Sequence, residues 1–341
     1  MHLVTGGHVK MLKAISELLL PFLLLVAAHA VSFADAPAFR DKIVFFGNTV
    51  DGRQRIESTA LDATQLQTLC ELPQGTSVLP GRISPDGRTL AFTLVTKESP
   101  RPALWLWEHG SERKKLSDNV TWVCAWSPNS ERIAGFDGDA DGRFASFTID
   151  VATGRRTKID LPETDWVDDW SPNGRTLLAT LGNPTRSYVR ADGEEYPLRA
   201  LISLDVSGER RTPITTDPQG DYIWPRYSPD GTQVAFYARY HRNGKTAEYA
   251  MIAGADGSNA RELACFTSLD NDELIKPNGA PCWAPDGRTI FFKVIKRPQI
   301  QDGVGADQTR FELAALASDG SGTRRIPLST ERSWWGFIDC R

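Results

Sequence analysis

Hydrophobic positions in this chain come in short runs rich in β-branched and aromatic residues, each bounded by glycine, proline, asparagine or aspartate. Runs of this kind predict β-strands. Three strands are expected before the first repeat described below, over residues 42–46, 56–61 and 67–71. Comparable runs return at residues 103–107, 144–150, 200–205, 247–253 and 311–317. The pattern therefore predicts an all-β protein.

A tight-turn motif recurs along the chain, and a short hydrophobic strand follows each copy. The copies read ISPDG at 83–87, WSPN at 126–129, WSPNG at 170–174, YSPDG at 227–231 and WAPDG at 283–287. Proline presets φ for the first corner, aspartate or asparagine suits the second, and glycine accepts the positive φ that closes the turn. Each copy therefore predicts a hairpin. With a third and a fourth strand joined by glycine turns, each unit becomes one blade of a β-propeller.

Counting the units predicts six blades of four antiparallel strands. Five motifs begin five blades, and the three opening strands lack only an innermost strand. The C-terminal segment 333–340, SWWGFIDC, can supply it, so we expect the C-terminal strand to join the N-terminal blade and close the ring. Such closure removes the exposed strand edges of an open array. The aromatic residue before each Ser-Pro or Ala-Pro pair is expected to pack between blades: Trp126, Trp170, Tyr227 and Trp283.

Two segments carry a specific family resemblance. PRYSPDG at 225–231 followed by VAF at 234–236, and PCWAPDG at 281–287 followed by IFF at 290–292, resemble the WD40-like (PD40) repeat of TolB-like β-propellers. The resemblance covers residues 41–341 and implies a periplasmic or secreted propeller that binds other proteins of the cell envelope. TolB itself carries a small α/β domain ahead of its propeller, whereas here Pro37 leads almost directly into the first strand. The partners of TolB are therefore not carried over.

The first 36 residues have the pattern of a signal peptide and short linker, which leaves 37–341 as the propeller. A weakly basic start precedes an apolar run over 18–28, and small residues follow at possible cleavage sites. The run is shorter than the roughly 20 residues of a membrane span, although an uncleaved anchor is the alternative. We therefore expect a periplasmic or secreted monomer without stable membrane insertion.

The charge of the chain bears on its possible partners, and its cysteines bear on disulfide formation. The formal net charge of −4 and the scattered lysines and arginines indicate no nucleic-acid partner. In an oxidising compartment one disulfide can form, and Cys265 with Cys282 would join adjacent strands. An odd count of five cysteines leaves at least one free thiol. Cys124 lies in an apolar setting typical of a buried residue rather than a nucleophile.

Loop lengths indicate a binding face. Turns after the first and third strands of a blade are tight, whereas the long connections, 182–198, 266–278 and 296–309, follow second and fourth strands and share the opposite face. The candidate ligand-binding residues are acidic, aromatic and basic: Asp165, Asp168, Asp221, Arg186, Tyr188, Tyr240, His241 and Arg297. Such a mixture suits a protein or peptide segment at the channel mouth. In the alternative interpretation, the aspartates only begin strands and cap turns.

One motif has the spacing of a calcium loop. Asp137, Asp139 and Asp141 with Gly142 follow the Asp-x-Asp-x-Asp-Gly pattern that presents alternate carboxylates to calcium. Thr148 stands where an EF-hand carries its bidentate glutamate, and an ordinary Asp-Gly hairpin turn explains the same residues. Calcium is the one cofactor that the sequence suggests.

Catalytic signals are sparse. Only His109 and His241 follow the signal segment, and neither a Gly-x-Ser-x-Gly motif nor a glycine-rich phosphate loop occurs. The sequence therefore favours a non-catalytic binding scaffold of the cell envelope, with no catalytic residue assigned. The alternative is a metal-assisted propeller lyase, or a lactone or carbohydrate hydrolase, that uses channel carboxylates such as Asp168 and Asp169 with His241.

Overall fold

A computed structural model describes most of the chain beyond residue 36. The described residues are 37–48, 52–62, 64–97, 99–139, 143–189, 195–207, 210–242, 245–266, 273–277, 279–298, 310–327 and 339–340. All regular structure in these ranges is β. Within them, no helix has the length and apolar character needed to cross a membrane. The expected signal peptide lies outside the described residues and stays a prediction.

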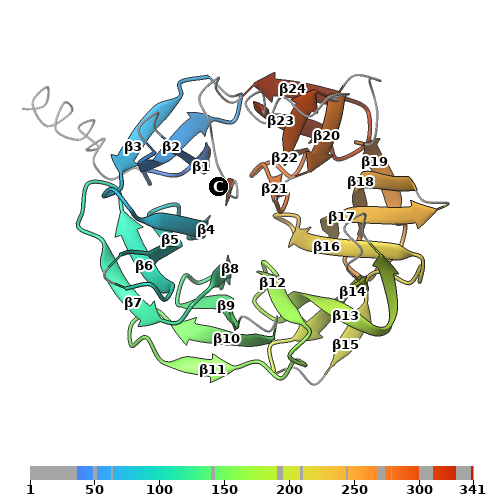
Figure 1. Ribbon diagram of the computed structural model, residues 1–341, viewed down its shortest axis with the longest axis horizontal. Helices are drawn as coiled ribbons and strands as arrows, with labels where there is room; N and C mark the ends of the chain where they lie inside the picture. The colour runs from blue at the N-terminus through green and yellow to red at the C-terminus, as the bar shows by residue number, and fades with distance from the viewer. Residues whose placement is uncertain are drawn as a thin grey trace, which may run out of the picture. The chain divides into compact units, whose positions relative to one another are not determined.

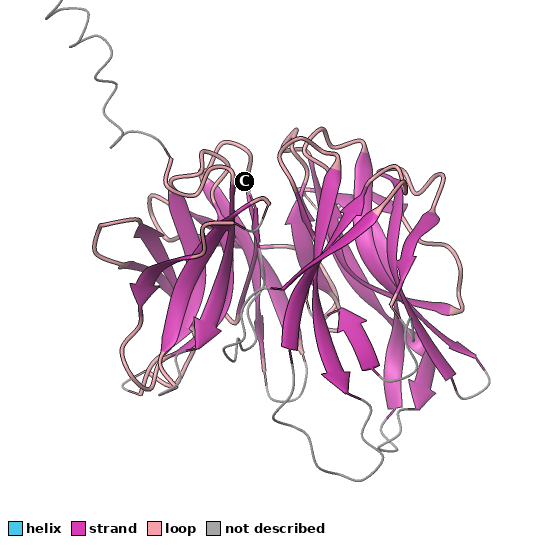
Figure 2. Ribbon diagram, turned by 90° about the horizontal axis from the view of Figure 1, so that it is seen from above, coloured by secondary structure: helices cyan, strands magenta, loops and turns pink. Residues whose placement is uncertain are grey.

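Residues from Ala38 onward form one compact unit, a ring of six antiparallel sheets (Figure 1). The strands of each blade run between the two faces of the ring, as Figure 2 shows. The chain is therefore an all-β, six-bladed β-propeller, as the sequence predicted.

The blades follow the chain in order. Blade 1 contains β4 (Ser77–Ile83), β5 (Thr89–Val95), β6 (Ala103–Glu108) and β7 (Lys114–Asp118). Blade 2 contains β8 (Trp122–Trp126), β9 (Arg132–Gly138), β10 (Phe144–Asp150) and β11 (Arg156–Lys158). Blade 3 contains β12 (Trp166–Trp170), β13 (Thr176–Val189), β14 (Glu195–Asp205) and β15 (Arg211–Pro213).

Blade 4 contains β16 (Gly220–Tyr227), β17 (Gln233–Arg242), β18 (Lys245–Gly254) and β19 (Arg261–Cys265). Blade 5 contains β20 (Glu273–Pro277), β21 (Cys282–Trp283), β22 (Thr289–Pro298), β23 (Arg310–Ala317) and β24 (Thr323–Pro327); β20 and β21 both pair with β22. Blade 6 contains β1 (Lys42–Asn48), β2 (Gln54–Ala60), β3 (Gln67–Glu71) and the C-terminal β25 (Asp339–Cys340).

Blade 6 contains strands from both ends of the chain. β25 pairs antiparallel with β1, with Cys340 opposite Ile43 and Asp339 opposite Val44. A disulfide joins Cys340 to Cys282 of blade 5. The expected Cys265–Cys282 pair is wrong: Cys282 is bonded to Cys340 of the C-terminal strand in the next blade, and Cys265 is in no disulfide.

The hydrophobic core lies between the blades. Six clusters of buried side chains each combine residues of two neighbouring blades; in one, Cys124, Ala134 and Phe136 of blade 2 pack with Val167 and Leu177 of blade 3. Burial of one large aliphatic or aromatic side chain contributes about 1.5–3 kcal/mol. The aromatic residues before the proline turns belong to these layers, as predicted, and the Trp126 indole donates to the carbonyl of Arg82 in blade 1 at 2.9 Å.

The repeated turn is held by its own polar residues. In blade 1, the Ser84 hydroxyl donates to Asp86 Oδ1 at 2.5 Å and accepts the Thr89 N–H at 2.9 Å. Gly87 closes the turn at φ 71° and donates its N–H to the Ser84 carbonyl at 2.8 Å. The same serine pattern holds in blades 2, 3 and 4. These contacts explain why Ser-Pro-Asp-Gly is the repeated unit.

Strand lengths differ around the ring. In blades 3 and 4 the two middle strands are 10–14 residues long, and β22 of blade 5 has 10, whereas the middle strands of blades 1, 2 and 6 have 6 or 7. The expected long loop over 182–198 is therefore wrong in part. β13 and β14 continue pairing past a bulge, with Ser187 opposite Pro197 and Tyr188 opposite Tyr196. The result is a projecting hairpin rather than an irregular loop.

Candidate functional site

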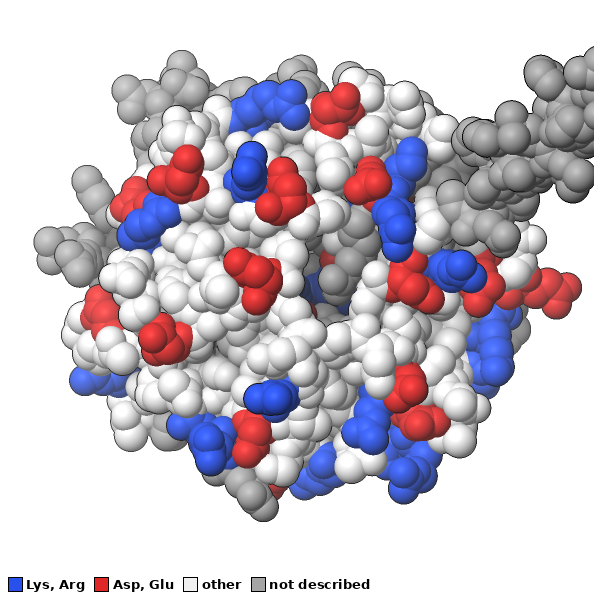
Figure 3. Space-filling view, turned by 180° about the vertical axis from the view of Figure 1, so that it is seen from behind, with Lys and Arg blue, Asp and Glu red and all other residues white. Residues whose placement is uncertain are grey.

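A cavity of about 430 Å³ opens at the centre of the ring, on the face that carries the proline turns. Its wall includes Trp126, Trp170 and Trp283, and its lining includes the five turn prolines Pro85, Pro128, Pro172, Pro229 and Pro285. Figure 3 shows a hollow at the centre of one face, with acidic and basic side chains interspersed around it. The volume lies within the range of about 300–1,000 Å³ that small-molecule sites occupy.

Six equivalent positions of the innermost strands line this cavity. In blades 1 to 5 the position lies two residues before the Ser or Ala of the turn. In blade 6 the equivalent residue is Asp339: it pairs with Val44 of the next strand, just as Arg82 of blade 1 pairs with Ala91. Around the ring the occupants are Arg82, Ala125, Asp169, Arg226, Cys282 and Asp339. The order Arg, small residue, Asp occurs twice. Like residues are three blades apart, on opposite sides of the axis.

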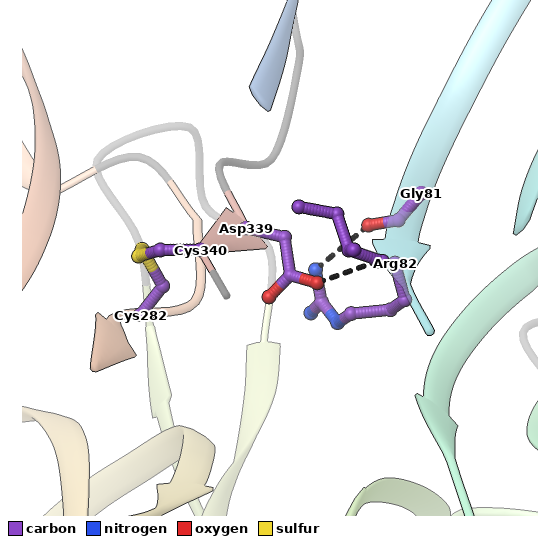
Figure 4. Close-up of a disulfide and its surroundings, with 6 residues drawn as sticks. Gly81, Arg82, Cys282, Asp339 and Cys340 are labelled. Atoms are coloured by element: carbon purple, nitrogen blue, oxygen red, sulfur yellow. Dashed lines mark hydrogen bonds between the residues drawn. A yellow bond between two sulfur atoms is a disulfide. The ribbon is translucent and has the colours of Figure 1, made fainter. Parts of the chain in front are cut away.

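The four charged members bind the backbone of a neighbouring blade. Asp339 Oδ2 accepts the N–H of Ile83 at 2.7 Å, and Asp169 Oδ2 accepts the N–H of Tyr227 at 2.8 Å. Arg82 donates through Nε to the Cys124 carbonyl at 2.8 Å. Arg226 donates through Nη1 to the Asp168 carbonyl. Figure 4 shows Asp339 between the disulfide and Arg82. The contacts fix all four side chains around the cavity.

A second polar cluster lies between blades 3 and 4 and contains two predicted ligand-binding residues, Asp221 and Tyr188. Asp221 is fully buried, and its carboxylate accepts Nε and Nη2 of Arg199 at 2.7 and 2.6 Å. Arg239 contacts Asp221 at 3.5 Å, Glu248 at 3.1 Å and the Tyr188 hydroxyl at 3.1 Å. The Arg239 guanidinium also lies 5.5 Å from the ring centre of Tyr237. The cluster ties the β13–β14 hairpin to blade 4.

Three other predicted residues belong to blades 3 and 4 or to the segment that leads into blade 3. Asp165 is buried and accepts the Gly182 N–H at 2.9 Å, at the point where β13 leaves the regular blade. Arg186, exposed on the hairpin, donates to the Pro218 carbonyl at 2.9 Å. Tyr240 shares a hydroxyl hydrogen bond of 3.0 Å with Tyr222. These contacts support the hairpins.

Asp168 is the third buried aspartate among the predicted ligand-binding residues, after Asp221 and Asp165. Its carboxyl accepts the Thr180 hydroxyl at 2.6 Å and the Trp166 indole N–H at 3.2 Å. The pKa of Asp168 is raised to about 8, chiefly by burial and to a smaller extent by the charge of Asp169, although the two hydrogen bonds and Arg82 lower it. Asp168 is therefore a neutral hydrogen-bonded carboxyl at neutral pH. It does not line the central cavity.

The remaining predicted residues are only partly placed. His241 lies in β17 and Arg297 in β22, but their side chains are outside the described part of the structure. None of the six predicted ligand-binding residues whose side chains are described lines the central cavity. Cys124 is buried, and burial raises the pKa of its thiol well above the ordinary value, as its apolar sequence context predicted.

The proposed calcium ligands have protein partners. Asp137 accepts the Thr121 hydroxyl at 2.8 Å, and Asp139 forms an ion pair of 2.9 Å with Arg143. Asp141 lies outside the described residues. Across the described ranges, no three His, Cys, Asp or Glu side chains are grouped as metal ligands would be. Calcium binding stays a prediction.

Sequence reasoning missed the ring of cavity positions. Arg82, Arg226 and Asp339 were not among its candidates, and Asp169 entered only as a possible catalytic carboxylate. Aligning the five turn motifs and reading the position two residues before each serine would have shown the alternation of Arg and Asp. Arg199, Arg239 and Glu248 carry no such signal, because their meeting depends on the register between blades.

The fold and its central cavity define a β-propeller, and comparisons with known proteins agree. No family model matches the chain. The structure of TolB from Acinetobacter baumannii superposes with a TM-score of 0.64 at 16% identity, covering 88% of this chain and 65% of that one. An oligogalacturonate lyase in complex with manganese superposes with a TM-score of 0.52 at 15% identity, covering 86% and 74%. The fold is that of a TolB-like propeller.

Among curated sequences, the chain is similar to dipeptidyl-peptidase 5 of Porphyromonas gingivalis. The two are 25% identical over 294 residues, and the match covers 69% of this chain and 39% of the peptidase. The chain therefore spans well under half the length of this relative. The similarity therefore does not assign the activity of the peptidase to this chain.

Proposed function

We propose that the protein is an exported, non-catalytic propeller that binds a protein or peptide segment of the cell envelope. The observation that carries this proposal is the projecting hairpin of blade 3, with the lengthened middle strands of blade 4 beside it. Exposed Arg186 and half-buried Tyr188 lie on this hairpin. The fold likeness to TolB supports a scaffold role and a periplasmic location.

The cluster between blades 3 and 4 makes this surface rigid. Asp221 holds Arg199 from β14 and Arg239 from β17, and Arg239 reaches Tyr188 near the end of β13. A surface ordered before binding loses less conformational entropy when a partner docks. A partner would therefore meet a fixed, mixed surface of aromatic and basic side chains, typical of the residues that dominate binding energy at interfaces.

Affinity capture with matched arginine variants tests the proposal. Arg186→Glu reverses an exposed charge on the hairpin, and Arg88→Glu makes the same change in an exposed proline turn on the opposite face. The wild type and Arg88→Glu should capture the same protein from envelope extracts of the producing cells, and Arg186→Glu should lose most of it. Equal capture by all three, or by none, would contradict the proposal.

The runner-up function is a metal-assisted lyase or a lactone or carbohydrate hydrolase. The fold likeness to the manganese-bound oligogalacturonate lyase supports it, together with the carboxyl of Asp169 on β12, which lines the central cavity. Incubation of the purified chain with oligogalacturonate and manganese tests it directly. Formation of unsaturated products, lost in Asp169→Asn, would favour the enzyme over the scaffold.

A further inference from the structure

The central cavity is a candidate site separate from the hairpin surface. It opens among the proline turns, whereas the projecting end of β13 lies at the opposite end of the blade from its turn. Among the described residues, the charged side chains of its lining are Arg40, Arg82, Arg226, Asp41, Asp169 and Asp339. They carry three positive and three negative formal charges. A simple anion or cation therefore gains no net attraction from these six side chains taken together.

The placement of these charges nevertheless favours a particular ligand. Arg82 and Arg226 occupy positions on opposite sides of the axis, and so do Asp169 and Asp339, because each pair is separated by three of six blades. A carboxylate is recognised by guanidinium donors, and an ammonium group by carboxylate acceptors. A ligand with both groups can satisfy an Arg and an Asp at once.

The lining is also ordered in advance. Asp169 and Asp339 are positioned by the N–H groups of Tyr227 and Ile83, and both arginines are positioned by carbonyls of adjacent blades. A binding site whose polar groups are already fixed avoids the cost of ordering them. Trp126, Trp170 and Trp283 add apolar wall for the remainder of a ligand.

We propose that this cavity binds a small zwitterion that carries an amine and a carboxylate, the class of free amino acids and dipeptides. The ammonium group contacts Asp169, and the carboxylate contacts Arg226, whose following residue Tyr227 donates its N–H to Asp169. The site is independent of the proposed scaffold function, because it uses no residue of the hairpin surface.

Calorimetric titration of the purified full-length chain, with its disulfide intact, tests this proposal. The probes are L-alanyl-L-alanine, its N-acetyl derivative, which lacks the cationic amine, and its C-terminal amide, which lacks the carboxylate. The free dipeptide should bind saturably at millimolar concentration or below, and each capped form should bind roughly tenfold or more weakly. Tryptophan emission should change in parallel, since three tryptophans line the cavity.

Matched variants locate the binding. Asp169→Asn keeps an oxygen acceptor for the Tyr227 N–H but removes the charge, so it should weaken the free dipeptide roughly tenfold and leave the N-acetyl form unchanged. Asp86→Asn is the control, because Asp86 lies exposed on the same face outside the cavity lining, and Asn129 and Asn173 occupy the equivalent place in other turns. No binding of the dipeptide, equal binding of the capped forms, or an unaffected Asp169→Asn variant would each overturn the proposal. The capture experiment on Arg186 is unaffected by any of these results.

Discussion

Two residues of the ring are in energetically unfavourable settings: Ser130 has a positive φ, and Asp168 has a buried carboxyl. Blades 1, 3, 4 and 5 close their proline turns with a glycine at φ 67–75°, whereas blade 2 has Ser130 at φ 60° in the same place. A side chain in this left-handed region is unfavourable by about 1 kcal/mol or more. Asp168 is a second example, since its carboxyl is buried and neutral rather than ionised.

Ser130→Gly should stabilise the protein. Relief of the positive φ outweighs the extra backbone entropy of glycine, so the free energy of unfolding should rise by up to about 1 kcal/mol. Urea denaturation measures the change. Gly174→Ser, the reverse substitution in the turn of blade 3 at φ 75°, should lower it by a similar amount. Stabilisation by both substitutions, or by neither, would show that the turn conformation does not set this energy.

Asp168 should make stability depend on pH. Its folded-state pKa of about 8 lies above the unfolded value near 3.9, so the folded state binds the extra proton between these values. Its contribution is therefore fully present below about pH 4 and is lost as pH rises to about 8. Asp168→Asn should flatten this slope and raise stability at pH 8 by on the order of 1–3 kcal/mol. Thermal melts from pH 5 to pH 8.5 compare the two proteins; an unchanged slope would contradict the assignment.

At the scale of elements, the blades are built from repeated hairpins, and the middle strands of blades 3 and 4 are lengthened. The repeat motif predicted the hairpins because its turn chemistry is local: Ser, Pro, Asp and Gly specify the turn regardless of the rest of the chain. The same reasoning treated 182–198 as a loop, because prolines and glycines interrupt it. Pairing with the partner strand beyond the bulge at Gly182 and Ser187 overrides that local signal.

The contact between blade 3 and blade 4 should depend strongly on Asp221. Asp221→Ala leaves Arg199 and Arg239 without their shared carboxylate in a mostly buried setting, so the free energy of unfolding should fall by about 3–5 kcal/mol. Asp118→Ala removes an exposed ion pair with Lys115 and should cost less than about 1 kcal/mol. Chemical denaturation of both variants checks the difference. Similar losses for the two would mean that the buried cluster does not hold the hairpin.

The whole molecule is a ring whose first and last described strands share a sheet. The blade count was predictable from the number of turn motifs, because each motif begins one blade. The disulfide partner was not predictable, since Cys282 and Cys340 are 58 residues apart and meet only when the ring forms. The central cavity was missed for the same reason: its lining combines one position from each of six blades.

Loss of the disulfide should destabilise the entire ring. Only two residue pairs join β25 to β1 in the described part of the chain, so the covalent link carries much of this seam. Cys340→Ser should lower the free energy of unfolding by about 2–5 kcal/mol. Cys70→Ser, at a half-buried free thiol, should change it by less than about 1 kcal/mol. Thermal melts under non-reducing conditions compare the variants. Equal melting temperatures would show that the disulfide does not stabilise the junction between the C-terminal strand and the ring.

Disulfide mapping by peptide mass spectrometry, on protein isolated from the envelope of producing cells, tests the central claim of an exported, covalently closed ring. The account predicts a linked peptide pair containing Cys282 and Cys340, and no disulfide-linked peptide containing Cys70, Cys124 or Cys265. A Cys265–Cys282 linkage, or five free thiols, would contradict it.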